Sequence, residues 1–270
     1  MKNLYLIAIM TFLTFFLADS SVQAEPDIEG TTVEYSTKGV SMKGYLAYDR
    51  GIKGKRPGVL VVHEWWGLND YAQKRARMLA ELGYAAMAID MYGDGKQAEH
   101  PDEAGKFSSE LMKNFSTAKD RFISAMEFFK KQPVVDSDKI AAIGYCFGGG
   151  IVLNMARQGV DNLRGVASFH GSLVAVTPAK QGDVKAKILV LHGADDKFIT
   201  GEQIEAFKKE MENAGVDFRF IVYPGALHSF TNPEADAYGK KFNIPVAYDA
   251  EADSSSWNEL KKFLQQIFDK

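Results

Sequence analysis

Gly144-Tyr145-Cys146-Phe147-Gly148-Gly149-Gly150 is the segment around which the rest of the chain can be assigned. Glycines two residues before and after Cys146, the only cysteine, allow a sharp turn from a strand into a helix. The pattern G-x-C-x-G is that of a nucleophile elbow in which sulfur replaces the serine oxygen. The positive end of the helix dipole would also favour the thiolate. We therefore interpret Cys146 as a reactive side chain; the alternative is a small apolar side chain packed beside a turn.

Around this segment, short apolar runs alternate with longer segments of helical periodicity. Continuous apolar runs predict buried parallel strands, and the segments between them predict helices on both faces of the sheet. Residues 31–35 and 41–48 are expected to form an antiparallel hairpin that turns at Lys38-Gly39. The predicted fold class is therefore α/β, with a mostly parallel central sheet and an N-terminal antiparallel hairpin. The other expected strands are residues 57–63, 84–90, 139–145, 165–170, 186–192 and 218–223.

Helical periodicity is clearest in residues 70–83, 102–131, 201–215 and 253–270, and a further helix should begin near Gly148. Gly83 and Gly215 stand where a glycine commonly ends a helix. Asp253-Ser254-Ser255-Ser256 offers side chains that can cap the start of the last helix. We therefore predict helix boundaries at these positions.

The N-terminal residues have the pattern of a secretory signal peptide. A positively charged start at Lys2 precedes an apolar run that ends at Asp19, and a small-residue segment ends at Ala24. A membrane anchor needs about 20 apolar residues, more than this interrupted run supplies. We therefore expect residues 1–24 to be a cleaved signal peptide, with no stable membrane anchor. The protein would be exported, to the periplasm in a Gram-negative source and otherwise into the medium, with residues 25–270 as a single domain.

Composition narrows the classes of partner. The chain has 270 residues, a formal net charge of −3 and no basic tract, which argues against nucleic acid or an anionic membrane surface. One cysteine cannot form a disulfide within the chain. No repeat or Pro/Gly/Ser-rich linker follows the signal segment. We expect a monomer whose partner is a small molecule.

Reactive side chains gather at the carboxyl ends of the predicted strands, where ligands bind in open parallel sheets. A thiol nucleophile needs a base and a group that orients this base. His228 follows the last strand and Asp195-Asp196 follows the preceding one, which gives the order nucleophile, acid, histidine of α/β-hydrolases. Spacing alone leaves both aspartates suitable. The residues at these strand ends are His63, Glu64, Asp90, Cys146, His170, His192, Asp195, Asp196 and His228.

Several imidazoles on one rim could in principle bind zinc. No i, i+4 pair or short ligand motif supports such a site, so we predict neither a metal nor another cofactor. The remaining strand-end histidines have structural interpretations. His192 is expected to bond locally beneath its turn, and His63 is expected to face the core beside the sheet.

Five motifs follow one another along the chain: His63–Asn69, Asp90–Tyr92, Gly144–Gly149, Gly193–Phe198 and His228–Phe230. Together they resemble the motifs of the dienelactone hydrolase family, within the α/β-hydrolase superfamily. The resemblance covers about residues 30–270, and its most specific part is Gly-Tyr-Cys-x-Gly-Gly with a later His-Ser-Phe. It implies an α/β-hydrolase fold and cofactor-independent hydrolysis of a small ester or lactone.

The resemblance also implies a role for each matching residue. Cys146 would be the nucleophile and His228 the base. The family pattern has an aspartate two residues before a phenylalanine, which selects Asp196 with Phe198 as the acid. Glu64 matches an additional acidic residue that contacts the resting thiol and helps to control its ionisation.

The remaining predicted site residues would surround the substrate. The backbone N–H groups of Trp65 and Phe147 would form an oxyanion hole. Trp66, Tyr92 and His170 are expected to line the pocket, because all three lie near strand ends.

Two positions depart from the family pattern. The resemblance implies arginines that grip the carboxylate of dienelactone, one after Asp-x-Tyr and one after His-Ser-Phe. Here Gly93-Asp94-Gly95 and Thr231-Asn232 follow those elements, and an aspartate would repel an anionic substrate. We therefore expect a Cys-His-Asp hydrolase that forms an acyl-cysteine on an unidentified ester or lactone. The alternatives are a thioesterase or peptide hydrolase at the same site, and a binding or thiol-sensing protein without turnover.

Overall fold

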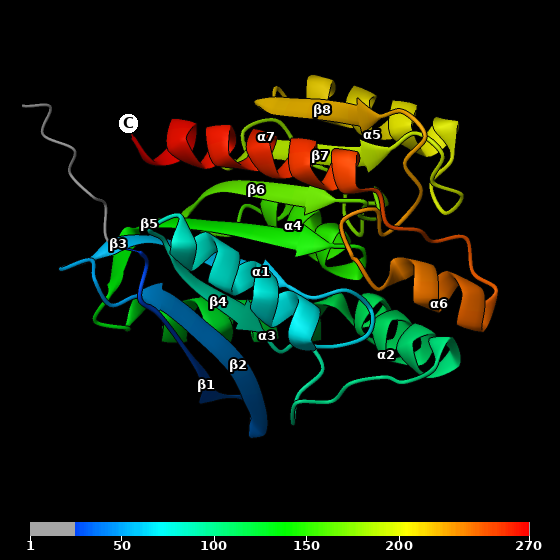
Figure 1. Cartoon of the computed structure of the whole chain (residues 1–270). Coiled ribbons are helices and arrows are strands. Elements are labelled where there is room, and N and C mark those ends of the chain that lie inside the picture. Colours follow the sequence, from blue (N-terminus) through cyan, green and yellow to red (C-terminus); the bar gives the residue numbers. More distant parts are fainter. Residues whose placement is uncertain (1–24, 270) are drawn as a thin grey trace, which may run out of the picture.

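The central sheet has eight strands in the order β1-β2-β4-β3-β5-β6-β7-β8. The computed structural model describes residues 25–269, so the predicted signal segment, residues 1–24, lies outside the described residues. β2 pairs antiparallel with β1 and with β4, whereas the remaining neighbours pair in parallel. The predicted mostly parallel sheet is confirmed (Figure 1). The strands are β1 (Ile28–Thr37), β2 (Val40–Asp49), β3 (Arg56–Val62), β4 (Ala85–Ile89), β5 (Val135–Tyr145), β6 (Leu163–Phe169), β7 (Lys187–Gly193) and β8 (Phe218–Tyr223).

The N-terminal hairpin turns where it was predicted to turn. Lys38 and Gly39 have positive φ angles of 48° and 84°, which bring β1 back on itself as β2. Both strands are longer than predicted, because pairing continues to Ile28 opposite Asp49. β1 therefore stands at the edge of the sheet and β2 joins it to β4.

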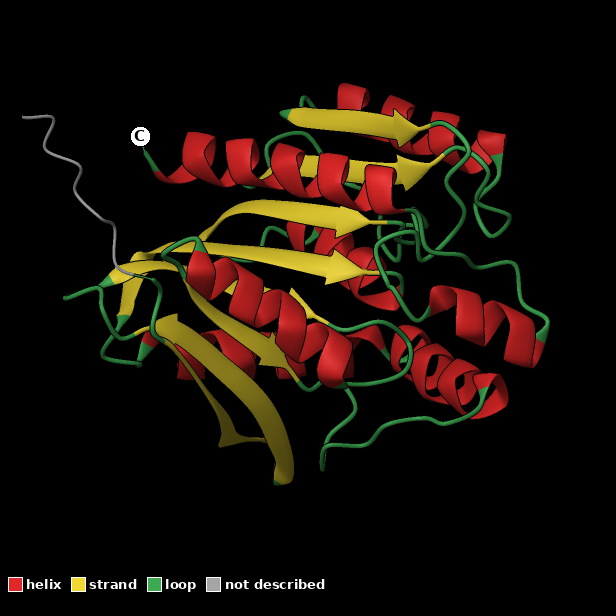
Figure 2. Cartoon of the chain, viewed as in Figure 1, coloured by secondary structure: helices red, strands yellow, loops and turns green. Residues whose placement is uncertain are grey.

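Helices cover both faces of the sheet (Figures 1 and 2). Side chains from α1 and α7 form one apolar core with one face, and side chains from α3, α4 and α5 form a second core with the other. Neighbouring residues of a strand point to opposite faces, so Leu60 joins the second core and Val61 the first. The helices are α1 (Asp70–Glu81), α2 (Pro101–Lys113), α3 (Phe115–Lys130), α4 (Phe147–Arg157), α5 (Gly201–Asn213), α6 (Ala235–Phe242) and α7 (Ala250–Phe268).

Two helices lie beyond the carboxyl ends of the parallel strands, α2 and α6 (Figure 1). The region of helical periodicity over residues 102–131 forms two helices, because Asn114 leaves the helical conformation and separates α2 from α3. His100, the histidine away from the strand ends, caps α2 by accepting from the Asp102 N–H. α6 was not predicted from the sequence; it is short and ends at a left-handed Asn243. Both helices stand over the edge of the sheet where the candidate site lies.

The last helix begins earlier than predicted. Asp249 caps α7, with its side chain accepting from the N–H groups of Glu251 and Ala252. The predicted cap at Asp253 is wrong, because this carboxylate lies inside the first turn and pairs with Arg75. Gly83 and Gly215 do follow helix ends, with positive φ angles of 89° and 65°. In residues 25–269, no helix combines the length and the apolar character needed to cross a membrane.

Candidate active site

Cys146 stands between β5 and α4 in a strained conformation, with φ 53° and ψ −116°. A positive φ is uncommon for a residue other than glycine, and such strain is a feature of nucleophile elbows. The backbone N–H of Cys146 donates to the Phe169 carbonyl at 3.0 Å and to Nδ1 of His170 at 3.1 Å. These two hydrogen bonds fix the backbone of Cys146 on the side of β6, and the thiol is partly exposed.

The glycines on either side of Cys146 permit close packing. A Cβ on Gly144 would lie 2.1 Å from the Gly148 carbonyl oxygen, and one on Gly148 would lie 2.3 Å from the Val62 carbonyl oxygen. Neither glycine has a positive φ. Both positions must therefore lack a side chain for α4 to pack closely against β3 and β5. The residue with the strained, positive φ is Cys146.

A histidine and a buried carboxylate meet beside the elbow. Nδ1 of His228, on the loop after β8, lies 2.8 Å from Oδ2 of Asp196, on the loop after β7. Oδ1 of Asp196 accepts from the Phe198 N–H at 2.8 Å, which fixes the carboxylate. The Asp195 side chain is exposed. The structure therefore brings Asp196, the aspartate selected by the family pattern, to the histidine.

The charge state of His228 reflects its two neighbours. Burial acts to lower its pKa, but the Cys146 side chain and the Asp196 carboxylate outweigh it and raise the pKa to about 10. An imidazolium beside a sulfur atom favours the thiolate form of that sulfur. His228 is therefore protonated at neutral pH and lies beside the Cys146 side chain.

Glu64 is bonded to the loop that carries His228. Ser229 Oγ donates to Oε1 of Glu64 at 3.0 Å, and Asn232 Nδ2 donates to Oε2 at 2.7 Å. Glu64 is only 2% exposed, and burial raises its pKa above the ordinary value despite these donors. The predicted contact with the resting thiol is not found among the hydrogen bonds of the described residues. Both oxygens of Glu64 are instead occupied by the histidine loop.

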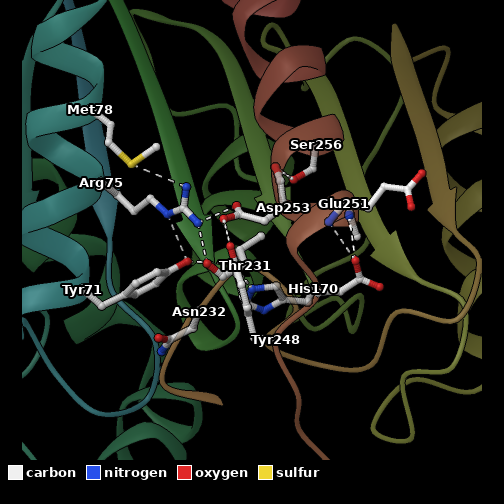
Figure 3. Close-up of polar contacts among 12 residues, drawn as sticks. Tyr71, Arg75, Met78, His170, Thr231, Asn232, Tyr248, Glu251, Asp253 and Ser256 are labelled. Atoms are coloured by element: carbon white, nitrogen blue, oxygen red, sulfur yellow. Dashed lines mark hydrogen bonds and ion pairs between the residues drawn. The ribbon is translucent and has the colours of Figure 1, made fainter. Parts of the chain in front are cut away.

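Thr231 fixes the same loop from the other side (Figure 3). Its Oγ1 lies 2.6 Å from the Tyr71 hydroxyl and 2.7 Å from Nε2 of His170. Its carbonyl accepts from Arg75 Nη2, which also donates to Asp253 at 2.6 Å. A continuous chain of buried polar contacts thus runs from α7 through α1 and Thr231 to the N–H of Cys146.

His170 was predicted to line the pocket, and this prediction is wrong. It is 0% exposed, its ring lies behind the elbow, and it does not line the cavity. Burial lowers its pKa well below the ordinary value, so the ring is neutral. Because Nδ1 accepts from the Cys146 N–H, the proton lies on Nε2 and is donated to Thr231.

Tyr92 is also absent from the cavity wall. Its hydroxyl donates to the Trp65 carbonyl at 2.9 Å, and its ring packs against those of His63 and Phe147. It therefore supports the segment that carries the predicted oxyanion-hole donor. The N–H groups of Trp65 and Phe147 have no acceptor among the described residues, so both are available to a ligand.

Three other strand-end residues have structural positions. His63 is buried, as expected, with Nδ1 bonded to the Glu64 carbonyl and Nε2 accepting from the Met91 N–H. Asp90 accepts from four backbone N–H groups and so shapes the loop after β4. His192 is buried, but the local bond expected for it is not found: its Nδ1 lacks a hydrogen-bond partner in the described part of the chain.

A cavity of about 340 Å³ opens over Cys146 and His228. Its volume lies at the small end of the range for small-molecule sites. Trp66, predicted to line the pocket, does so and packs against Tyr238 of α6 with a ring-centroid distance of 4.7 Å. Four serines and Gln203 supply most of its polar groups. The apolar part of the wall includes Trp65, Trp66, Met112, Phe198, Ile199 and Val246.

The arrangement of side chains in the described residues does not form a metal site. Within residues 25–269, no three His, Cys, Asp or Glu side chains are grouped so as to hold a metal ion. The histidines of the rim are directed to different partners: His170 to Thr231, His228 to Asp196 and His63 to the Glu64 carbonyl.

Comparison with known proteins points to one family. A sequence model of the dienelactone hydrolase family matches residues 42–268. Protein usf of Aquifex pyrophilus is 30% identical over 229 residues, covering 81% of this chain and 97% of that protein. The "Putative carboxymethylenebutenolidase" of Aquifex aeolicus is 30% identical over 217 residues, covering 78% of this chain and 92% of that protein. The crystal structure of a dienelactone hydrolase-like promiscuous phosphotriesterase from metagenomic libraries is 35% identical, with a TM-score of 0.82, covering 90% of this chain and 99% of that one.

Proposed function

The chain belongs to the dienelactone hydrolase family and is an ester or lactone hydrolase of that type, and we propose that it acts through Cys146, His228 and Asp196. The observation that carries this proposal is the geometry at the elbow. A strained cysteine lies at the base of an apolar cavity, beside a histidine held 2.8 Å from a buried aspartate. The proposed reaction needs no cofactor, because each group that moves a proton or forms a bond is a side chain of the chain itself.

The first half of the reaction forms an acyl-cysteine. The Cys146 thiolate attacks the carbonyl carbon, and the carbonyl electrons move to oxygen, where the N–H groups of Trp65 and Phe147 stabilise the oxyanion. When the carbonyl re-forms, the bond to the leaving oxygen breaks. The His228 imidazolium gives that oxygen its proton, and the alcohol departs.

The second half releases the acid. His228, now neutral, takes a proton from water, whose oxygen attacks the thioester carbonyl. Collapse of this second tetrahedral intermediate breaks the carbon–sulfur bond. It leaves the carboxylic acid, the thiolate and the imidazolium, so the starting charge state returns. Asp196 keeps Nδ1 of His228 protonated and so directs the other ring nitrogen to the reacting atoms.

Steady-state hydrolysis of 4-nitrophenyl esters and of cis-dienelactone tests this assignment. Cys146→Ala should remove hydrolysis, whereas turnover retained by that variant would overturn the assigned nucleophile. Asp196→Asn should lower kcat by at least about 100-fold, because general acid–base catalysis contributes about 10²–10⁴. Asp195→Asn is the matched control, since its side chain is exposed. Impairment of Asp195→Asn alone would contradict the choice of acid.

Other activities at the same site are distinguished by substrate. A thioesterase or peptide hydrolase would favour thioesters or amides over oxygen esters at equal leaving-group reactivity. A neutral phosphotriester is a further candidate, because the cavity wall is apolar and a 35% identical relative is described as a promiscuous phosphotriesterase. A binding or thiol-sensing protein would show ligand-induced thermal stabilisation or reversible oxidation of Cys146 without hydrolysis.

We also propose that the protein is exported, loses residues 1–24 and acts as a monomer. The signal-like pattern at Lys2 to Ala24 supports the first two points. Fractionation of the source cells and the intact mass of the purified protein test them, with Glu25 as the expected first residue. A mature protein that retains Lys2 would contradict cleavage.

A further inference from the structure

We infer that the site selects esters and lactones whose acyl part is uncharged, and that it rejects carboxylated ones such as dienelactone itself. This inference rests on the proposed function, because it concerns the same site and the same reaction. It adds the charge class of the substrate, which the family relationship alone would assign differently.

The first observation is the chemistry of the cavity wall. Among the described residues that line it, no side chain is a lysine or an arginine. Lys197 follows the acid of the triad directly, but its side chain is exposed and is not part of the wall. Among the described residues of the wall, the one cationic group is the imidazolium of His228, which already faces Cys146 and Asp196. A substrate carboxylate would therefore find no cation of its own.

The second observation concerns the two positions that depart from the family pattern. Asn232 is fully buried, and its amide donates to Glu64 rather than into the cavity. Asp94 is exposed, and its carboxylate lies 3.6 Å from Lys96 at the surface. Neither residue lines the cavity, so neither supplies a replacement for an arginine.

The third observation is an acid directly behind the wall. Ser229 lines the cavity, and its hydroxyl donates to Glu64, whose carboxyl group is therefore one hydrogen bond from the site. In either protonation state Glu64 offers no positive charge. When ionised, it repels an anion across a short path of low polarity.

The composition of the wall makes the transfer of an anion from water into the cavity unfavourable. A carboxylate that leaves water for an apolar cavity loses its hydration, and the neutral polar side chains of the wall, such as Gln203, replace it only in part. A bidentate arginine would offset that loss, and the cavity holds none. The aromatic and aliphatic wall instead favours an apolar acyl group, whose burial is favourable in proportion to its area.

A pair of substrates that differ in one charge tests the inference. Mono-4-nitrophenyl adipate carries a free carboxylate, and methyl 4-nitrophenyl adipate has the same leaving group and acyl length without it. We expect kcat/KM for the methyl ester to exceed that for the acid by at least about 100-fold, since removing one partner of a buried charge pair commonly has effects of this order. Equal values, or a preference for the acid, would overturn the inference.

A gain-of-charge variant makes the test specific to the cavity. Ser109 lines the cavity from α2 and is solvent-exposed, so Ser109→Arg can be accommodated without disturbing the core. It should raise kcat/KM for the acid at least about tenfold relative to the methyl ester. The matched control Ser109→Gln should leave the ratio of the two substrates unchanged. No change of the ratio in Ser109→Arg would show that a missing cation does not limit use of the acid, and would overturn the explanation.

Failure of this inference and failure of the proposed function give different results. If the mechanism is wrong, both adipate esters are inert or survive Cys146→Ala alike. If only the inference is wrong, the acid is hydrolysed well and that hydrolysis disappears in Cys146→Ala. A preference for the methyl ester that vanishes at about 1 M salt would assign the selectivity to surface charge rather than to the cavity, and would likewise overturn the inference.

Discussion

At the scale of single residues, backbone strain is concentrated at the site. Cys146, His170 and Ser229 all have positive φ, at 53°, 40° and 59°. Hydrogen bonds to distant residues fix all three. The Cys146 N–H donates to the His170 ring, and the Ser229 hydroxyl donates to Glu64. Strained residues persist only where surrounding contacts fix them, so these hydrogen bonds account for the geometry of the loops that carry Cys146 and His228.

The raised pKa of His228 predicts an alkaline limit to activity. In the proposed mechanism the leaving group takes the imidazolium proton, so kcat/KM should hold through neutral pH and fall as pH rises through about 10, the pKa of His228. Asp196→Asn should move this limb to lower pH, since the Asp196 carboxylate is one of the groups that raise that pKa. The pH profile of kcat/KM is the measurement, with Asp195→Asn as the control. A limb that Asp196→Asn leaves in place would contradict the pairing.

The sequence identified the elbow but not the contacts behind it. G-x-C-x-G is a local pattern, and the Asp-x-Phe pattern of the family selected Asp196 where spacing left Asp195 open. Glu64 is separated from its partners Ser229 and Asn232 by 165 and 168 residues. No local pattern reports such contacts, so the sequence did not predict that Ser229 and Asn232 donate to Glu64.

At the scale of secondary-structure elements, Arg75 joins α1, α7 and the loop that carries His228. Its guanidinium is 3% exposed and bonds Asp253 of α7 and the Thr231 carbonyl (Figure 3). It also lies over the rings of Tyr145 and Trp257. A buried cation is tolerated only when it is paired and hydrogen-bonded, as here. These contacts fix the position of the His228 loop against two helices.

The start of α7 gives a test of element boundaries. Asp249→Ala removes the side chain that accepts from two N–H groups of the first turn. It should lower the free energy of unfolding by about 0.5–2 kcal/mol. Ser254→Ala, at an exposed position where the sequence predicted a cap, should change it by less than about 0.5 kcal/mol. Denaturant unfolding of the two variants measures this, and a larger effect of Ser254→Ala would contradict the assigned cap.

Strands and helices differed in how well the sequence located them. The apolar runs of β3, β4 and β7 were located within one residue, because both of their faces are buried and the runs are continuous. The first residue of a helix, by contrast, depends on which single side chain caps it. Both Asp249 and Asp253 are suitable caps by residue type, and only the pairing of Asp253 with Arg75, 178 residues away, decides between them.

At the scale of the whole molecule, the parallel sheet collects loops from distant parts of the sequence at one edge. The loops after β3, β5, β7 and β8 bring Trp65, Cys146, Asp196 and His228 together. α2 and α6 lie over the same edge (Figure 2). Ser109 of α2 and Tyr238 of α6 complete the cavity wall. The sheet thus fixes the positions of these side chains, and α2 and α6 shape the cavity above them.

The burial of Glu64 predicts a pH dependence of global stability. Its folded-state pKa is raised above the ordinary value, so the folded protein binds a proton more tightly than the unfolded chain. Between those two pKa values, the stability contributed by Glu64 falls as pH rises. Glu64→Gln cannot ionise, so its Tm relative to the wild type should be more favourable at about pH 7.5 than at about pH 4.5.

Thermal unfolding of both proteins at the two pH values measures this difference. Gln keeps an oxygen that can accept from Ser229, which limits the loss of contacts on substitution. If the variant becomes relatively less stable as pH rises, the ionised carboxylate is favoured by the fold, which would contradict the direction assigned to its pKa.

The most direct test of the central claim is the intact mass of the protein during turnover. A 4-nitrophenyl ester with an uncharged acyl group is mixed at saturating concentration, quenched in acid within milliseconds and analysed by mass spectrometry. The account predicts a mass increase of one acyl group, located on the peptide that contains Cys146 and lost once substrate is exhausted. An acyl group on any other residue, or release of 4-nitrophenol by Cys146→Ala at the wild-type rate, would contradict it.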